Sequence, residues 1–142
     1  MLPRSRAALE RAYRDTTYRV YLPGGAAIDL LPDDRSATLD RLLARTRVRE
    51  WAFLTAWNPG SRPLPGWRNA MRQRRLLDLL ARGAPVVLPA AGIPASLDWA
   101  PEDSLFAAGL PRSAALRLAR RFGQNAVVAG RRGRPAELVW VR

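Results

Sequence analysis

The chain contains neither cysteine nor histidine in its 142 residues. These absences exclude disulfides, thiol nucleophiles, Ser-His and Cys-His dyads, imidazole general bases, and zinc sites built from thiolates or imidazoles. Chemistry in this chain must therefore use carboxylates, hydroxyls, amides, arginine, or a borrowed metal or cofactor. Asp98, Glu102 and Asp103 carry oxygen ligands of the kind that hold hard cations, but their spacing matches no established metal motif. We expect no bound metal and no cofactor.

Long apolar runs are also missing, since no stretch approaches the roughly 20 residues needed to cross a bilayer. Residues 1–14 are rich in arginine and alanine and lack the apolar core of a signal peptide. We therefore expect a cytoplasmic protein without membrane contact. The length, and the lack of repeats or linkers, predict a single domain over residues 1–142. Nothing in the sequence indicates an oligomeric state.

Lysine is absent as well, so the 24 basic residues are all arginine, against 12 acidic residues and a net charge of +12. The coding bias of a GC-rich genome would explain arginine in place of lysine, but it would not explain the excess of positive charge. Arginine pairs with phosphate in a bidentate geometry, so the charge favours nucleic acid or another phosphate-bearing ligand as a partner. The alternative is that these charges are solvated and maintain solubility.

Apolar periodicity and turn residues predict an α+β fold, a mixed β-sheet with three to four helices packed mainly on one face. The expected helices lie at about 4–14, 36–46, 67–82 and 111–122. The expected strands lie at 16–22, 26–30, 51–57, 86–89, 104–108, 126–129 and 137–141, and residues 90–102 are expected to form a long loop.

Strand 51–57 is apolar on both faces, which predicts a central position in the sheet. The strand–helix–strand rule predicts that strand 86–89 runs parallel to it. Gly83 is expected just beyond the end of the helix at 67–82, in the C′ position. Pro111 and Gly123 are expected to bracket the helix at 111–122.

Two of these helices have one arginine-rich face each. At 100° per residue, four arginines of helix 67–82 fall within one arc, namely Arg68, Arg72, Arg75 and Arg82. In helix 111–122, Arg117, Arg120 and Arg121 lie opposite an apolar face. If both helices cover the same face of the sheet, their arginines could form a continuous cationic surface. The residues expected to bind anions are Arg68, Arg72, Arg75, Arg117, Arg120 and Arg121, together with Arg131, Arg132 and Arg134 of the closing hairpin turn.

The apolar pattern of helix 67–82 is interrupted by two amides. Asn69 and Gln73 share an arc with the core leucines, so they point inward, and a buried amide must find polar partners. Strand 51–57 delivers Asn58 to the same end. Glu102 and Gln124 precede later strands, and they join this group only if those strands run antiparallel to strand 51–57. Such a polar cluster serves equally well as a structural network or as a ligand site.

Several of these residues also carry a family resemblance. The segment 53–59 with Ser61, then Asn69, Glu102-x-Ser104 and the segment 122–126, resembles the bacterial domain-of-unknown-function family 3293 over about residues 13–141. The resemblance implies a small cytoplasmic single-domain protein without an assigned activity. It adds weight to Asn58, Asn69, Glu102, Ser104 and Gln124 as site residues.

Two main functions are open from the sequence. The first is a phosphate-, nucleotide- or nucleic-acid-binding module with a polar pocket at the end of strand 51–57, in which Trp67 or Trp99 stacks on a base. The second is a small enzyme that acts on a polar or nucleotide-like substrate, with Glu102 as acid/base and the pocket residues Asn58, Asn69, Gln73, Ser104 and Gln124 around it. A third hypothesis, a protein-interaction adaptor, has no distinctive support.

Overall fold

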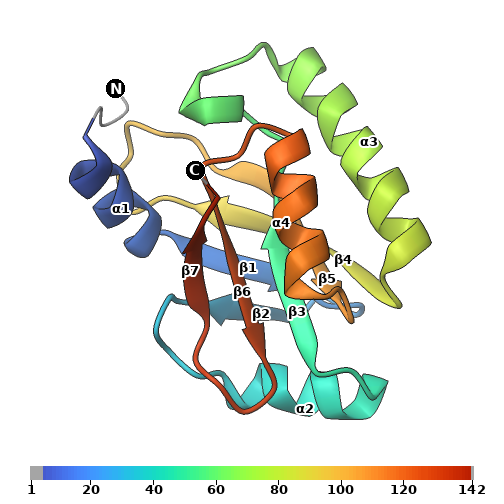
Figure 1. Ribbon diagram of the computed structural model, residues 1–142. Helices are drawn as coiled ribbons and strands as arrows, with labels where there is room; N and C mark the ends of the chain where they lie inside the picture. The colour runs from blue at the N-terminus through green and yellow to red at the C-terminus, as the bar shows by residue number, and fades with distance from the viewer. Residues whose placement is uncertain (1–4, 142) are drawn as a thin grey trace.

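The structure is a computed structural model and describes residues 5–141. Within this range the expected helices and strands all form, with shifted ends (Figure 1). The helices are α1 (Arg6–Arg14), α2 (Ala37–Thr46), α3 (Gly66–Gly83) and α4 (Arg112–Arg121), with a 3-10 turn, η1, at Pro59–Ser61. The strands are β1 (Thr17–Tyr21), β2 (Ala27–Leu30), β3 (Glu50–Leu54), β4 (Val86–Ile93), β5 (Glu102–Ala108), β6 (Ala126–Arg131) and β7 (Glu137–Trp140). Residue 4 of the expected first helix lies outside the described residues.

The seven strands form one sheet in the order β2-β1-β4-β5-β3-β6-β7, and every neighbouring pair is antiparallel. The expectation of a mixed sheet is therefore wrong. The sheet curls into a half-barrel, so that β1 and β2 run across the direction of β6 and β7 (Figure 1). The expected interior position of β3 is confirmed, since β5 and β6 pair with its two edges.

β4 runs parallel to β3, as expected, but the two strands do not pair with each other. β3 and β4 both pair antiparallel with β5, so they run the same way, with β5 inserted between them. The crossover through α3 fixes the direction of β4 relative to β3. It does not determine which strand lies between the two. β5 and β6 both run opposite to β3, and this places their first residues beside the last residues of β3.

β4 also extends through residues that were expected to form a loop. Residues 90–93 pair with β1 on one side and with β5 on the other. Pro89 favoured an end of the strand at this position, because proline has no N–H group to donate to a neighbouring strand. The pairing with β1 covers only Ala90–Ile93, so Pro89 lies where β4 has a partner on one side alone. Proline is tolerated at such a position.

Helices pack on both faces of the sheet, which corrects the expectation of one main face. Leu76 and Leu80 of α3 and the small residues of α4 pack in one core with Ala52 and Leu54 of β3. Leu39 and Leu43 of α2 pack in a second core, whose β3 residues are Trp51 and Phe53. Since successive strand residues point to opposite faces, β3 supplies both cores. α1 lies on the same side as α2, because its residues line a cavity together with Tyr18 and Phe53 of the second core.

The helix ends depend on single residues. Ser36 caps α2 by accepting the Leu39 N–H at 3.1 Å. Gly123 follows α4 in the left-handed conformation at φ 69° and ends the helix. Gly83, in contrast, is the last residue of α3 rather than its C′ residue, and its φ is not positive. None of the helices in residues 5–141 is long and apolar enough to span a membrane.

Candidate functional site

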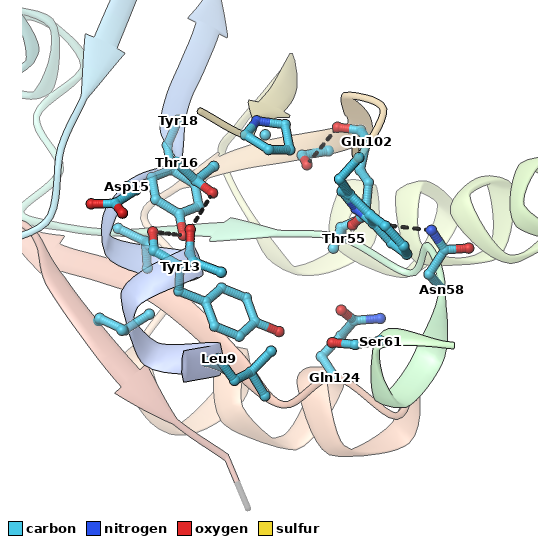
Figure 2. A pocket seen from close by; sticks show the side chains of 18 of the residues that line it. Leu9, Tyr13, Asp15, Thr16, Tyr18, Thr55, Asn58, Ser61, Glu102 and Gln124 are labelled. Carbon is cyan, nitrogen blue, oxygen red and sulfur yellow. Dashed lines mark hydrogen bonds between the residues drawn. The ribbon is translucent and has the colours of Figure 1, made fainter. Parts of the chain in front are cut away.

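A cavity of about 280 Å³ opens where β3 ends, on the side of the sheet that carries α1 (Figure 2). Its walls come from α1, from the starts of β1, β5 and β6, and from the segments that follow β3 and β4. Among the described residues, its lining includes four aromatic side chains, two amides, several hydroxyls and the carboxyl groups of Asp15, Asp98 and Glu102. The residues on which the argument depends are Tyr13, Tyr18, Asn58, Trp99, Glu102 and Gln124.

The antiparallel arrangement brings together the polar residues that the sequence left conditional. Asn58 follows β3, while Glu102 begins β5 and Gln124 precedes β6. All three line the cavity, because the starts of β5 and β6 flank the end of β3. Ser104 also lines it, is 5% exposed, and donates its hydroxyl to the Glu102 carbonyl at 3.2 Å.

Asn58 is the hub of the polar network. Its backbone is left-handed, at φ 44°, a conformation that asparagine adopts more readily than most residues. Its Oδ1 accepts from Asn69 Nδ2 at 2.8 Å and from the Leu64 N–H at 3.0 Å. Its Nδ2 donates to Glu102 Oε2 at 2.8 Å. The two donors on Oδ1 leave one orientation for the Asn58 amide, with the NH2 group toward Glu102.

Asn69 supports this hub from α3 and faces inward, as its position among the leucines indicated. It is 1% exposed. Its Oδ1 accepts the Asn58 N–H at 2.9 Å, and its Nδ2 donates to Asn58 Oδ1 and, at 3.3 Å, to the Leu64 carbonyl. Asn69 does not line the cavity, so its direct role is to hold the segment 58–64.

Glu102 has one carboxylate oxygen fixed and one open. Oε2 accepts from Asn58 Nδ2 and, at 3.1 Å, from Trp99 Nε1. Oε1 has no hydrogen-bond partner among residues 5–141, and it is not sealed from solvent. Burial raises the pKa of Glu102 above its usual value of 4.5, and the hydrogen bonds from Asn58 and Trp99 oppose part of that rise.

Gln124 and Gln73 anchor the chain on either side of Trp57. Gln124 Nε2 donates to the Trp57 carbonyl at 3.0 Å and to the Phe122 carbonyl at 3.3 Å. Gln73 Oε1 accepts the Ala56 N–H at 2.9 Å, but Gln73 lies outside the cavity. Gln73 Nε2 and Trp57 Nε1 are buried without a partner within residues 5–141. The expectation that both buried amides would be satisfied therefore holds for Asn69 and only for the oxygen of Gln73.

Sequence reasoning named Trp99 as a stacking residue but missed the tyrosines that complete the aromatic side of the cavity. Tyr13 from α1 projects toward Gln124 and Ser61 (Figure 2). The Tyr18 hydroxyl donates to the Tyr13 carbonyl at 2.7 Å and ties β1 to α1. Burial raises the pKa of both tyrosines, so both hydroxyls stay protonated and can donate. Local periodicity contained no signal for this wall, because it forms between α1 and strands far along the chain.

The cavity differs in charge from the rest of the protein. None of its described lining residues is an arginine, although the chain has 24 basic residues. Three of them are acidic, namely Glu102 and the exposed Asp15 and Asp98. No group of three acidic side chains in the described part of the chain is arranged to hold a metal ion. The electrostatics of the lining therefore disfavour an anion and favour a neutral or cationic guest.

Most of the expected anion-binding arginines are exposed on α3 and α4, which cover the same face of the sheet. Arg72 is an exception and corrects the expected arc. Its guanidinium donates to the Ala56 carbonyl at 2.8 Å and to the Phe122 carbonyl, so it joins α3 to the end of β3 and to the end of α4. Burial lowers the pKa of Arg72, with Arg68 and Arg75 contributing.

The basic turn lies apart from these helices. β6 starts beside the cavity and carries the chain away from it, so the turn that contains Arg131, Arg132 and Arg134 lies at the other end of the strand, next to α2 (Figure 1). The Arg132 N–H donates to the Arg49 carbonyl at 2.8 Å, and the Gly133 N–H donates to Asp40 Oδ1 at 2.8 Å. The expected arginines therefore do not form one anion-binding surface.

Comparison with known protein families gives a match over the centre of the chain. The model of a family described as "Protein of unknown function (DUF3293)" matches residues 54–127, a narrower range than the sequence resemblance suggested but more than half of the chain. The match contains Asn58, Asn69, Glu102, Ser104 and Gln124. No curated protein and no solved structure matches the chain significantly.

Proposed function

This chain belongs to the DUF3293 family, whose function is unknown, and we propose that its cavity binds a small polar molecule on which Glu102 acts as a general acid–base. The observation that carries the proposal is the state of the Glu102 carboxyl group. One oxygen is held by Asn58 and Trp99, and the other is open to the cavity. A carboxyl group that is buried, oriented and still accessible is the arrangement that proton transfer requires.

The surroundings of Glu102 suit this role. Burial raises its pKa above the usual value of 4.5, and a higher pKa makes the carboxylate a stronger base. Asn58 cannot rotate away, because its own oxygen is held by Asn69 and Leu64. The bound molecule would lie between Glu102 Oε1 and the Tyr13 side of the cavity. The reaction class is removal and return of a proton on the bound molecule, without a covalent intermediate, since the cavity contains no activated nucleophile among its described residues.

The protonation of Glu102 can be followed directly. Trp99 Nε1 donates to Glu102 Oε2, so the indole N–H resonance of Trp99 should titrate with this carboxyl group. We expect its midpoint above the usual glutamate value of 4.5, because the desolvation of Glu102 outweighs its two hydrogen bonds. Proton–nitrogen NMR spectra across the acidic and neutral range measure this, with the resonance assigned by its loss in Trp99→Phe. A midpoint at or below 4.5 would remove the basis for acid–base chemistry.

Stability should follow the same titration. The folded state binds the Glu102 proton more tightly than the unfolded chain does. The contribution of Glu102 to the free energy of unfolding therefore decreases as pH rises from the unfolded pKa through the raised folded pKa. In Glu102→Gln this decrease should disappear, while the folded spectrum is retained.

A small-molecule screen tests the function itself. We expect members of a set of small aromatic cations, neutral compounds and anions to shift the Trp99 indole resonance. Glu102→Gln should change which of them bind without unfolding the protein. If no compound of any charge class perturbs Trp99, the proposed function fails.

A second candidate function is single-stranded nucleic-acid binding by α3 and α4. Trp67 is 67% exposed and lies next to Arg68 at the start of α3, an unusual position for a tryptophan. Exposed tryptophan beside arginine is typical of surfaces on which bases stack while phosphates are neutralised. Two further exposed arginines of these helices form ion pairs, Arg74 with Asp78 and Arg112 with Glu137. Five others form no ion pair with described residues; they are Arg75, Arg82, Arg117, Arg120 and Arg121.

Salt dependence tests this second candidate. Binding of labelled oligo(dT), followed by fluorescence anisotropy, should weaken with salt by a log–log slope of about −0.7 per neutralised phosphate. The double substitution Arg120→Ser with Arg121→Ser should reduce that slope by about one to two units. Arg131→Ser with Arg132→Ser removes the same charge at the far end of β6 and should leave the slope unchanged. Equal effects of the two pairs would mean that only net charge matters.

A further inference from the structure

Two oxygen atoms of residues that line the cavity accept no hydrogen bond from the described residues. Glu102 Oε1 is one, as described above. Gln124 Oε1 is the other, because both hydrogen bonds of the Gln124 side chain are made by Nε2, and Oε1 is not sealed from solvent. Figure 2 shows the Gln124 amide directed into the cavity, on the side opposite Glu102. The guest therefore meets acceptors on two sides.

The orientation of Gln124 follows from its neighbours. Only an NH2 group can donate to two carbonyls, so the contacts with Trp57 and Phe122 exclude the flipped amide. Glu102 is fixed in a similar way, since Asn58 and Trp99 are both donors and occupy the same oxygen. Gln124 therefore cannot turn a donor toward the guest while these contacts last, and its Oε1 is a permanent acceptor. Glu102 Oε1 is an acceptor whenever the carboxyl group is ionised, which is the form that removes a proton.

The rest of the lining points to the same kind of guest. The described walls contain no arginine that could meet a phosphate or carboxylate, and they contain Asp15 and Asp98 at exposed positions. Tyr18, Phe53 and Trp99 offer aromatic surface. A planar nitrogen base with N–H donors would satisfy the acceptors and pack against these rings, and a positive charge on it would be favoured by the carboxylates.

We propose that the cavity selects a small planar nitrogen base that presents N–H donors, such as an amidine, a guanidine or an aminated heteroaromatic ring. This inference rests on the proposed function and names the class of molecule that the site accepts. It also separates the cavity from the phosphate chemistry expected from net charge. The overall charge of +12 attracts anions, so a preference for a cationic base can arise only from the local arrangement of the acceptors.

Benzamidine and benzoate provide a matched pair of probes, because they have the same shape and opposite hydrogen-bonding groups. Phenyl phosphate serves as the third probe. We expect benzamidine to shift the Trp99 indole resonance at concentrations at which benzoate and phenyl phosphate do not, in a buffer of physiological ionic strength. In Glu102→Gln, Asn58 and Trp99 should hold the amide oxygen, so that an NH2 group replaces the acceptor. Benzamidine should then bind at least about tenfold more weakly, and benzoate should bind more tightly.

Asp103→Asn is the control for loss of one negative charge. Asp103 is exposed, neighbours Glu102 in β5 and is not part of the cavity, so its substitution should leave the binding of all three probes unchanged. Binding of benzoate or phenyl phosphate at Trp99 without benzamidine would overturn the inference and leave the proposed function standing. Equal loss of benzamidine binding in both variants would also overturn it. A lack of response to every probe would remove the proposed function together with the inference.

Discussion

Asn69→Leu should lower the free energy of unfolding by about 3 kcal/mol or more. The leucine matches the asparagine in size but removes the acceptor for the Asn58 N–H and the donor to Asn58 Oδ1 and the Leu64 carbonyl. Asn69 is 1% exposed, so water cannot replace these contacts without a rearrangement of the segment 58–64. Each buried polar group that is left unpaired costs about 1–3 kcal/mol. Urea denaturation measures the loss.

Met71→Leu is the matched control on the same helix. Met71 is 61% exposed, so its substitution should change stability by less than about 0.5 kcal/mol. Asn69→Leu should also move the Trp99 indole resonance, because Asn58 loses one of the two donors that orient its amide. If Asn69→Leu is as stable as the parent protein, the amide network does not hold this loop.

Gly109→Ala should destabilise the protein by a similar amount, about 3 kcal/mol, through a different mechanism. Gly109 joins β5 to α4 at φ 84°, a conformation that favours glycine. A Cβ atom at this position would lie 2.6 Å from Pro85 Cδ and 2.8 Å from Pro85 Cγ. The proline ring is rigid, so the backbone itself would have to move. The Gly109 N–H also donates to the Glu50 carbonyl at 2.7 Å, and that shift would strain the start of β3.

Gly83→Ala should have the opposite effect. Gly83 ends α3 with a φ that is not positive, and a Cβ there would meet no atom within 4 Å. Alanine should therefore stabilise the protein by about 0.5–1 kcal/mol, since it loses less conformational entropy than glycine on folding. Thermal denaturation of both variants tests the pair. Equal effects at the two positions would show that the conformation and surroundings of Gly109 are unimportant.

The sequence was sufficient to locate the polar half of the site. Asn69 and Gln73 stood out because two amides interrupted a leucine stripe, and such an interruption is visible in a single helix. The approach of Glu102 and Gln124 to Asn58 depended on strand direction, which the sequence left open. The antiparallel pairing of β3 with β5 and β6 decided it. The residues of this cluster differ in position. Asn69 is buried and lies outside the cavity, whereas Glu102 lines it.

Other features could not be predicted, because they depend on contacts between distant segments. Arg72 lies at the border of the inner stripe of α3, three residues after Asn69 and four before Leu76, so helical spacing alone places it on either side. Its inward position follows from two carbonyls, Ala56 and Phe122, that become available only once β3 and α4 have packed. The aromatic wall has the same origin, since Tyr13 and Trp99 come to line one cavity only in the folded chain.

The helix α1 forms one wall of the cavity without contributing a buried residue. Its residues Leu9, Ala12 and Tyr13 all line the cavity. It also precedes the region matched by the family model, whereas Asn58, Glu102 and Gln124 lie within that region. Substitutions along this helix should therefore change the volume of the cavity while the Glu102 carboxyl group and the hydrophobic cores stay intact. Such a division would let relatives specialise for different guests without evolving a new scaffold.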